Sequence, residues 1–461
     1  RDSLWLDEAI SYLTANFSAS DILNNINESP HPPLYYLLLH YWLKVIPDSD
    51  TAIRSLSLLS NLLLIPVIYQ LTHDLLGRYS LALLAALFIA ISPFQIAYSH
   101  ELRMYTLLML LVTLTAWTYW RAIHDGKWYW WLLFFLSALL AMYTHFFSFF
   151  VLAAIGLYAL INYRNQRALM MTIVIGLLLA VLFLPWLYIV LGKVEVGTGS
   201  LRPLRTTENN PIKSIITFTF LMFGHSTNLW YSGAALFLTV AIIVIVMIEM
   251  RRVRQEDEAQ ALRFLVLLVL CAIILPIIYY HVRPFFLPER TMAAASPFLM
   301  ILLAWAVTRR HSPLPYLVMA AAFTMFVGSL VYLFSEAQKP PYREAIQFVA
   351  QNRENGDVVL HTSDGSYLSA LRYENLPDHV LLAGDPDPRK PVAVYQAFGG
   401  DVWERETAVH AGQRLWLIVA LEHSVAWQQT QSQSIADEYT LVDEQEFGGI
   451  KVYLYDLESG R

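Results

Sequence analysis

Cysteine and charged residues are both scarce in this chain. The single cysteine among 461 residues, Cys271, lies inside an apolar run. This excludes an intrachain disulfide framework and a metal cluster built on several cysteines. Charged residues make up 15% of the chain, and the net charge of −6 is small for this length. Nothing in that balance favours nucleic acid as a partner.

Apolar residues, in contrast, are abundant, at 56% of the chain with a mean hydropathy of +0.45. Soluble proteins do not carry so many apolar runs of near-bilayer length, so the composition indicates a polytopic α-helical membrane protein. We expect about 10 to 12 spans plus interfacial helices. The candidate spans are residues 54–72, 79–98, 103–121, 129–144, 146–163, 169–191, 231–249, 262–280, 291–308 and 313–334.

Residues 1–50 precede the first of these spans and are interpreted as the first outer loop. Residues 34–45 are apolar and aromatic but too short to span, which is typical of a helix lying in the membrane interface. Pro32 and Pro33 suit its start, because the first helical positions need no amide hydrogen. The chain begins at Arg1 and not at a methionine, and we expect a first membrane helix upstream of it.

Basic residues cluster in the loops at one end of the predicted bundle. They are Arg121, Lys127, Arg164, Arg167, Arg251, Arg252, Arg254, Arg309 and Arg310. If these loops are cytoplasmic, alternation of the spans makes all of them mutually consistent. The polar segments then fall together on the extracytoplasmic side of the cell (inner) membrane: residues 7–8, 31, 92–105, 143–145, 192–230 and 281–290. Polar residues from the whole chain on one face predict a site built between helices.

The composition changes after Phe334 to that of a water-soluble domain, residues 336–461. Pro340 and Pro341 predict a stiff hinge, followed by an amphipathic helix over 342–353. Four short β-type runs then alternate with helical stretches, at 357–362, 379–384, 414–421 and 451–457. This alternation predicts a small α/β domain, which the topology places on the extracytoplasmic side. Without a glycine-rich nucleotide fingerprint, the domain is interpreted as a substrate-facing cap or a structural module.

Two adjacent carboxylates, Asp7 and Glu8, lie in an otherwise apolar stripe of the first predicted helix. One interpretation is a solvated acidic pair that favours the positive end of the helix dipole. The other is catalytic, because an acid held against apolar surface at a membrane edge is costly unless it is used. A carboxylate there could take a proton from a substrate hydroxyl while a bond at a sugar carbon breaks.

Three arginines on the same predicted face suggest an anion site. With Ser99 as the helix N-cap, Arg103 falls in the first turns of the next span, where a cation opposes the helix dipole. Glu101 could neutralise it, or a bound phosphate could use both the dipole and the guanidinium. Arg283 and Arg290 raise the same question, although snorkelling explains most arginines at membrane edges.

His31 and His145 are weaker candidates, since a lone histidine at a helix start or break is usually a hydrogen-bonded structural residue. Together with Asp7 and Glu8 they could hold a divalent cation. Their spacing carries no metal signature of the HExxH kind, so the sequence leaves metal binding open.

Several motifs occur in one order along the membrane part: LWLDEA from Leu4, HPPLYYLLLHYW from His31, SPFQIAYSHELRMY from Ser92, MYTHFF from Met142 and PER from Pro288. In this order they resemble the type C glycosyltransferases, and more narrowly the prokaryotic membrane mannosyltransferase-like group related to protein O-mannosyltransferases and aminoarabinose transferases. The resemblance covers nearly all of residues 1–335, which it implies form a type C glycosyltransferase membrane domain. Each motif alone is weak, and the combination is specific.

The resemblance implies an inverting transfer of a sugar from a polyprenyl-phosphate donor, of the undecaprenyl or dolichyl type, to an acceptor protein, lipid or glycan. It assigns the general base to Asp7, with Glu8 beside it, and the donor phosphate to Arg103 and Arg290. It implies no cofactor with certainty and leaves a divalent cation open. The candidate substrate-binding residues are His31, Glu101, Arg103, Tyr105, His145, Arg283 and Arg290.

One departure from the family pattern concerns the position before His31. Relatives often carry an acidic residue there, whereas this chain has Pro30, with Glu28 further back. A role of that acid in holding an acceptor or a metal is therefore in doubt here.

Two functions of other classes stay open at this point. A transporter or flippase of a lipid-linked or anionic substrate would also use intramembrane charges, although transporters more often show repeat symmetry and paired broken helices. A non-catalytic membrane scaffold would not need acids and arginines clustered on one face.

Overall fold

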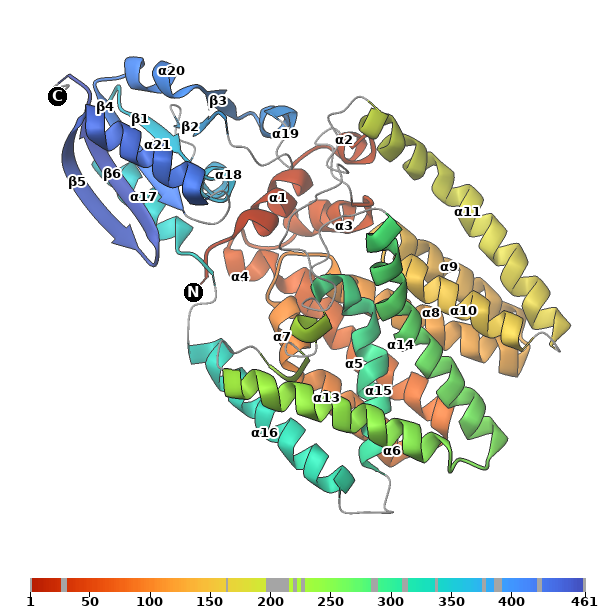
Figure 1. Ribbon diagram of the computed structural model, residues 1–461. Coiled ribbons are helices and arrows are strands. Elements are labelled where there is room, and N and C mark those ends of the chain that lie inside the picture. Colours follow the sequence, from red (N-terminus) through yellow and green to blue (C-terminus); the bar gives the residue numbers. More distant parts are fainter. Residues whose placement is uncertain are drawn as a thin grey trace.

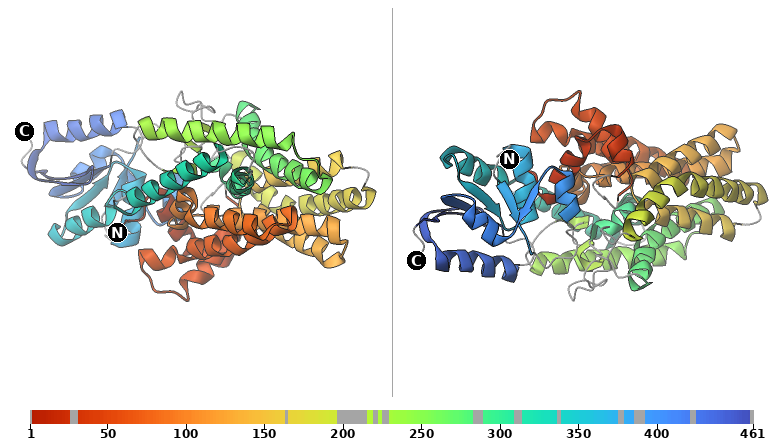
Figure 2. Two further views of the ribbon diagram at one scale, coloured as in Figure 1. Left: turned by 90° about the horizontal axis from the view of Figure 1, so that it is seen from below. Right: turned by 90° about the horizontal axis from the view of Figure 1, so that it is seen from above.

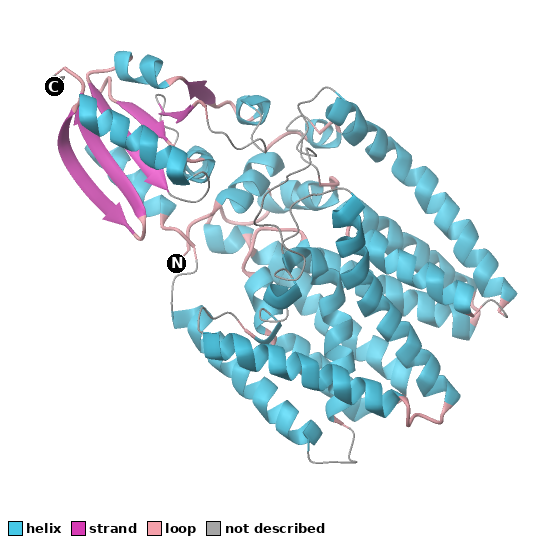
Figure 3. Ribbon diagram, viewed as in Figure 1, coloured by secondary structure: helices cyan, strands magenta, loops and turns pink. Residues whose placement is uncertain are grey.

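The structure is a computed structural model that describes residues 2–25, 31–162, 165–195, 215–218, 222–224, 229–282, 289–308, 314–335, 339–374, 379–384, 392–420 and 425–458. Its larger part is a bundle of helices (Figure 1). The strands lie together in one small domain at one end (Figure 3). Two further views show this domain at the end of an elongated molecule (Figure 2). The predicted fold class, a polytopic helical protein with a small C-terminal α/β domain, is confirmed.

Four short helices precede the bundle: α1 (Leu6–Ala15), α2 (Ala19–Leu23), α3 (Leu34–Leu43) and α4 (Asp50–Ile53). The helix predicted over 34–45 is confirmed as α3, with Pro33 at its N-cap position. At 1.5 Å per residue, its 10 residues extend about 15 Å, roughly half of a bilayer core. As the sequence predicts, α3 is too short to span.

The ten predicted spans all correspond to helical segments. These are α5 (Ser55–Leu76), α6 (Tyr79–Ile91), α7 (Pro93–Ser99), α8 (Tyr105–Asp125), α9 (Trp128–Thr144), α10 (Ser148–Ile161), α11 (Gln166–Glu195), α13 (Leu229–Met250), α14 (Glu256–Val282), α15 (Ser296–Val307) and α16 (Leu314–Ser335). A 3-10 helix, η1 (Glu289–Ala295), leads into α15. Among the described residues, 7 helices are long and apolar enough to cross a bilayer, or 8 if α6 and α7, bent by 52°, form one span. The chain is therefore a multi-pass membrane protein.

Helices α8 and α15 form the centre of the bundle, because most of their side chains are buried, Tyr119 and Trp305 among them. Helices α11, α13 and α16 instead expose large apolar side chains such as Leu177, Phe237 and Leu317. Apolar surface of that extent suits contact with lipid. A polar site shielded from lipid can therefore form at the ends of α8 and α15.

The turn between α7 and α8 differs from the expectation from sequence. Ser99 does not cap the following helix: it is the last residue of α7, and its hydroxyl donates to the Ile96 carbonyl. Helix α8 begins at Tyr105, so Arg103 lies in the preceding turn and not inside the helix. Pro93 starts α7 as a separate helix, whose last serine bonds back to its own final turn. Arg103 still faces the positive end of the α8 dipole.

The C-terminal domain is an α/β unit on one 6-stranded sheet. Its elements are α17 (Tyr342–Asn352), β1 (Val358–His361), α18 (Asp364–Tyr373), β2 (His379–Leu382), α19 (Val392–Ala397), β3 (Asp401–Trp403), α20 (Arg405–His410), β4 (Arg414–Ala420), α21 (Val425–Glu438), β5 (Thr440–Phe447) and β6 (Ile450–Asp456). The strand order is β3-β2-β1-β4-β6-β5, with β1 to β4 parallel and β6 antiparallel to both neighbours.

The predicted helix and the four predicted strands of this domain are confirmed as α17, β1, β2, β4 and β6. Strands β3 and β5 are not predicted from the sequence. β3 has only 3 residues, and β5 is an exposed edge strand that carries acids where a buried strand would have an apolar run.

Helix α1 lies between the C-terminal domain and the bundle (Figure 1). Its apolar face packs into a cluster with residues of that domain, formed by Leu6, Ala9, Ile10, Leu13, Tyr367, Leu368, Leu371, Leu381, Tyr395, Phe398 and Val402. Phe17, just after α1, stacks on Phe398 with ring centroids 5.5 Å apart. The segment that carries the acidic pair therefore belongs to the packing of both parts of the protein.

Candidate active site

Asp7 and Glu8 both lie in the first turn of α1 but face different surroundings. Adjacent residues of an α-helix project about 100° apart, so one helix can present two acids to two different places. The Asp7 side chain is 23% exposed, whereas the Glu8 side chain is completely buried. The position at the helix N-terminus favours both charges through the helix dipole.

The Glu8 carboxylate is fully engaged by surrounding donors. Arg54 donates from Nε to Oε1 and from Nη2 to Oε2, both at 2.8 Å. The backbone N–H of Leu102 donates to Oε1 at 2.8 Å, and Lys339 Nζ lies 2.9 Å from Oε2. Burial alone would raise the pKa of Glu8, but the Arg54 hydrogen bond and the charges of Lys339 and Arg54 hold it below its usual value. Glu8 is therefore an anion that joins three segments of the chain.

The Asp7 carboxylate instead faces two arginines from distant parts of the chain. Arg290, in η1, donates from Nη1 to Oδ2 at 2.6 Å, and Arg103 Nη2 lies 3.8 Å from the same oxygen. Arg103 also donates from Nη1 to the Asp7 carbonyl and to Ser11 Oγ, at 3.2 Å each. The Arg290 guanidinium lies over the Trp5 ring, 5.7 Å from its centroid. Arg103 and Arg290 thus converge on Asp7 from two elements.

Two histidines complete this cluster. Arg103 Nη2 lies 3.3 Å from His31 Nε2. Because a guanidinium can only donate, Nε2 is the acceptor, and the proton of neutral His31 is on Nδ1. The His31 and His145 rings are 5.0 Å apart, and His145 lies 5.8 Å from the ring of Tyr105. Burial and the nearby arginines lower the pKa of His145 to about 3 and hold that of His31 well below its usual value, so both are neutral.

Glu101 lies on the same side of the protein, in the turn before α8. Burial raises its pKa to about 7, although the charge of Lys339 opposes this. Three buried polar atoms here lack a hydrogen-bond partner among the described residues: Glu101 Oε2, Arg103 Nε and Trp5 Nε1. Buried polar atoms are nearly always hydrogen-bonded in folded proteins, so these atoms suggest a polar ligand or water.

Among the described residues, the cluster around Asp7 carries an excess of positive charge while Glu101 is neutral. Arg103 and Arg290 together contribute two positive charges and Asp7 one negative charge, while the two histidines are neutral. A buried cation without a counter-charge is costly. An anion with one charge, such as a phosphodiester, would balance the cluster and could accept hydrogen bonds from both guanidinium groups.

The structure brings together most of the candidate residues predicted from sequence. Asp7, His31, Arg103, Tyr105, His145 and Arg290 form one cluster, with Glu8 and Glu101 on its margin. Arg283, Pro30, Glu28 and most of the loop 192–230 lie outside the described residues. Within the described part of the chain, no group of three or more His, Cys, Asp or Glu side chains could hold a metal ion.

Four residues of the site were not among the candidates from sequence: Trp5, Ser11, Arg54 and Lys339. Arg54 and Lys339 carry a detectable signal, because each is a lone cation at the boundary between a polar loop and an apolar span. Trp5 and Ser11 carry no such signal. Their roles depend on the face of α1 that meets Arg103 and Arg290, which only tertiary structure fixes.

Residues 30–189 match a family model described as dolichyl-phosphate-mannose-protein mannosyltransferase. This stretch includes His31, Arg103 and His145, while Asp7 and Arg290 lie outside it. A search of curated proteins found no match.

Solved structures with the same fold include two of ArnT from Cupriavidus metallidurans. The apo structure matches with a TM-score of 0.64 and 13% sequence identity, covering 98% of this chain and 94% of that chain. The structure bound to undecaprenyl phosphate matches with a TM-score of 0.67 and 12% identity over the same shares of both chains. The likeness extends over the membrane part and the C-terminal domain alike.

Proposed function

We propose, from the type C glycosyltransferase fold of this chain and its mannosyltransferase-like segment over residues 30–189, that it is an inverting glycosyltransferase. The enzyme moves a sugar from a polyprenyl-phosphate-linked donor to an acceptor hydroxyl at the extracytoplasmic face of the membrane. Fold alone does not assign a reaction, so the proposal depends on the site. The observation that carries it is the pair of arginines, Arg103 and Arg290, that meet at Asp7. Among the described residues they leave one positive charge in excess while Glu101 is neutral.

In this reaction Asp7 is the general base. Its carboxylate takes the proton from the acceptor hydroxyl while that oxygen forms a bond to the anomeric carbon of the sugar. The bond from this carbon to the phosphate oxygen breaks on the opposite face, and the polyprenyl phosphate leaves with the electron pair. Attack and departure on opposite faces invert the configuration at that carbon.

The arginines bind the phosphate and stabilise the charge that it gains. Arg290 now donates to Asp7 at 2.6 Å, so a donor phosphate would compete with Asp7 for this guanidinium. Donor binding therefore frees the Asp7 carboxylate for the acceptor proton, and the leaving phosphate gains charge-assisted hydrogen bonds in exchange. The ArnT structure that contains undecaprenyl phosphate supports the same class of lipid for this chain.

Asp7→Asn in membranes supplied with a polyprenyl-phosphate sugar tests this function. The change removes the base and leaves the side chain nearly isosteric, so transfer should fall by about 10² to 10⁴ while donor binding survives. Asp257→Asn is the matched control, because Asp257 is an exposed acid in the first turn of α14. Undiminished transfer by the Asp7 variant would contradict the proposal. Movement of the lipid-linked sugar across the membrane with no transfer would favour the alternative, a transporter or flippase.

A further inference from the structure

The C-terminal domain holds the segment just before Asp7 by a set of polar contacts. Tyr373, at the end of α18, accepts a hydrogen bond from the Leu4 backbone N–H at 2.6 Å. Its hydroxyl in turn donates to Asp50, in α4, at 2.5 Å. Ser369 Oγ donates to the Leu4 carbonyl at 3.0 Å. Both polar groups of the Leu4 backbone, three residues before Asp7, are therefore bonded to one helix of the C-terminal domain.

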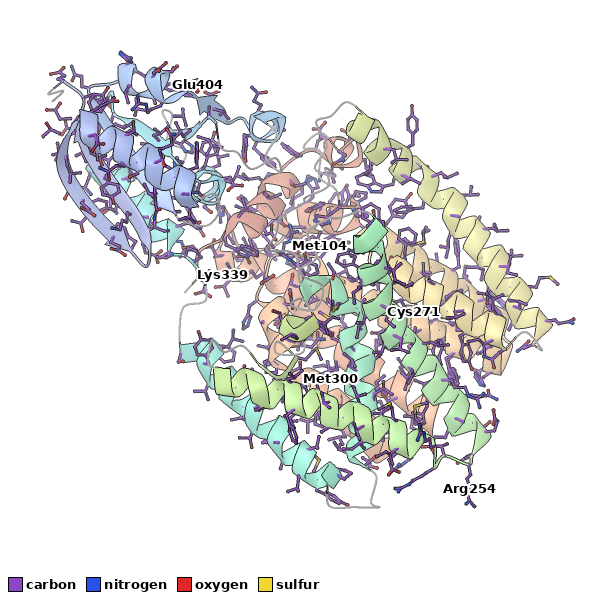
Figure 4. The ribbon with its side chains drawn as sticks, in the orientation of Figure 1. Met104, Arg254, Cys271, Met300, Lys339 and Glu404 are labelled. Carbon is purple, nitrogen blue, oxygen red and sulfur yellow. The ribbon has the colours of Figure 1, made fainter. Side chains whose placement is uncertain are left out.

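A second contact comes from the entrance to that domain. Lys339 lies where the chain passes from the bundle into the C-terminal domain (Figure 4). Its ammonium is 2.9 Å from Glu8 Oε2 and donates to the His100 carbonyl at 3.3 Å. Glu8 is the residue next to Asp7, and His100 belongs to the turn that carries Arg103. Lys339 thus connects the start of the C-terminal domain to both α1, which carries Asp7, and the turn that carries Arg103.

Apolar packing adds to these polar contacts. Leu6, Ala9, Ile10 and Leu13 of α1 lie in a cluster with side chains from α18, β2 and β3 and from the segment around α19. Helix α1 has 10 residues, and helices shorter than about 12 to 15 residues are marginal in water without tertiary contacts. The position of α1 therefore depends on the surfaces that enclose it, one of which is the C-terminal domain.

We propose that the C-terminal domain is a positioning element of the active site, which holds helix α1 through Lys339 and Tyr373 so that Asp7 faces Arg103 and Arg290. This inference rests on the proposed function and gives that domain a role in the same reaction. In the described contacts Lys339 and Tyr373 do not touch the Asp7 carboxylate or the two arginines. They are positioning residues, and their loss should affect turnover more than donor binding.

Four variants of the full chain test the proposal. Lys339→Met removes the contact to Glu8 of α1, and Tyr373→Phe removes the hydrogen bond to the Leu4 backbone just before α1. Both variants keep most of the side-chain volume. Lys339→Arg keeps the charge, and Lys451→Met is a control at a lysine in β6 of the same domain whose side chain is 42% exposed. Amide hydrogen exchange over residues 6–15 reports how firmly α1 is held, and it does not require activity.

The variants should change amide exchange in α1 and not across the whole chain. Exchange over α1 should accelerate by about tenfold or more in Lys339→Met and Tyr373→Phe and stay unchanged in Lys451→Met. Turnover should fall roughly tenfold to a hundredfold, since a displacement of about 1 Å in a catalytic group has effects of that size. The donor KM should stay within about twofold of the original, and Lys339→Arg should restore most of the loss.

A pH profile separates positioning from general destabilisation. Arg54, Lys339 and the Leu102 N–H hold the pKa of Glu8 low, whereas Glu101 lies nearby as a second acid. Removing the Lys339 charge raises the pKa of Glu8, so its carboxylate becomes protonated at a higher pH. The acid limb of activity should then move to higher pH in Lys339→Met and return in Lys339→Arg.

Unchanged exchange over α1 in both Lys339→Met and Tyr373→Phe would overturn the proposal. Faster exchange spread over the whole chain, with an equal loss in Lys339→Arg, would also overturn it, because that pattern marks general destabilisation. A protein with no transferase activity would contradict the proposed function, and the exchange measurement would still show whether the domain holds α1.

Discussion

The two ends of helix α8 carry arginines in opposite electrostatic situations. Arg121 lies in the last turns of α8, where a cation favours the helix dipole, and Gly126 ends the helix with a positive φ of 66°. The Arg121 guanidinium lies 2.6 Å from the Asp125 carboxylate and 3.3 Å from the Asp74 carboxylate. It also lies over the ring of Trp130. Arg121 therefore has two acids for one cation. Arg254 lies at this same end of the bundle (Figure 4).

Arg103 is at the other end of α8, where the direction of the helix dipole and the ratio of acids to cations are reversed. It precedes the positive end of the dipole, only 4% of it is exposed, and it shares Asp7 with Arg290. The comparison contrasts a structural ion pair at one end of α8 with a candidate binding site at the other. At the Arg121 end two acids of the protein neutralise one cation. Among the described residues of the Arg103 end two cations share Asp7, and an anion from outside would complete the balance.

Substituting the two arginines in turn gives the largest expected difference. Arg103→Ala should weaken binding of a polyprenyl-phosphate donor by about tenfold to a hundredfold, the loss of a charge-assisted contact, and should reduce transfer at least as much. Arg121→Ala should leave donor affinity within about twofold. Binding of the labelled donor to protein in lipid discs measures both.

Expression and folding of both variants must match the original protein for this comparison to hold. Thermal unfolding in the same lipid discs supplies that control. Equal donor affinities for the two variants would remove Arg103 from the phosphate site and end the contrast between the ends of α8.

The pH dependence of donor binding should be the next largest effect. Glu101 has a pKa of about 7 and faces Lys339 and Arg290, together with the acids Glu8 and Asp7. Below this pH it is neutral; above it the ionised carboxylate competes with the donor for the nearby cations. A phosphodiester donor keeps one charge throughout, so its dissociation constant should rise by roughly three- to tenfold from about pH 6 to about pH 8.

Glu101→Gln should flatten this dependence, because glutamine does not ionise. The histidines do not confuse the measurement, since the pKa of His145 is about 3 and that of His31 is also far below the range tested. An unchanged slope in the glutamine variant would assign the titration to another group.

The comparison also shows how far the sequence could lead. Apolar runs predicted ten spans that all correspond to helical segments, and the alternation of these spans predicted that Asp7, His31, Arg103, His145 and Arg290 would share one face. Hydrophobic length and alternation of spans are properties of the chain itself, so these predictions needed no tertiary information.

The separation of Asp7 from Glu8 could not be predicted in this way. From the sequence the two acids are interpreted as a pair in which Glu8 assists the general base Asp7. The structure instead places Glu8 against Lys339 and against Arg54, which lies 46 residues further along the chain. Which face of α1 meets which partner depends on packing against two domains. The turn at Ser99 could not be predicted either. The Ser99 hydroxyl donates to the Ile96 carbonyl instead of capping the next helix, and α8 begins only at Tyr105.

Trp5 offers a smaller test of the Arg103 end. Its buried Nε1 has no hydrogen-bond partner among the described residues, and its ring lies beneath Arg290. Trp5→Phe keeps an aromatic face for the arginine but removes the donor. If Nε1 binds a hydroxyl of the sugar, transfer should fall by about three- to tenfold with little change in affinity for the sugar-free polyprenyl phosphate, the loss of one neutral hydrogen bond. An equal loss of affinity for both lipids would assign Trp5 to the support of Arg290.

The smallest effect on activity should come from a substitution at the Arg121 end of α8. Asp74 accepts from Trp117 Nε1 at 2.8 Å and from Arg121 at 3.3 Å, so Asp74→Ala removes the acceptor of two half-buried donors. The free energy of unfolding should fall by about 1 to 3 kcal/mol, seen as a lower melting temperature in lipid discs. Transfer per folded molecule should not change, because Arg121 is already paired with two acids of the protein and leaves no excess positive charge for an anionic ligand. A loss of turnover in the folded Asp74 variant would mean that the two ends of α8 are coupled, and that charge balance alone does not separate structure from function in this bundle.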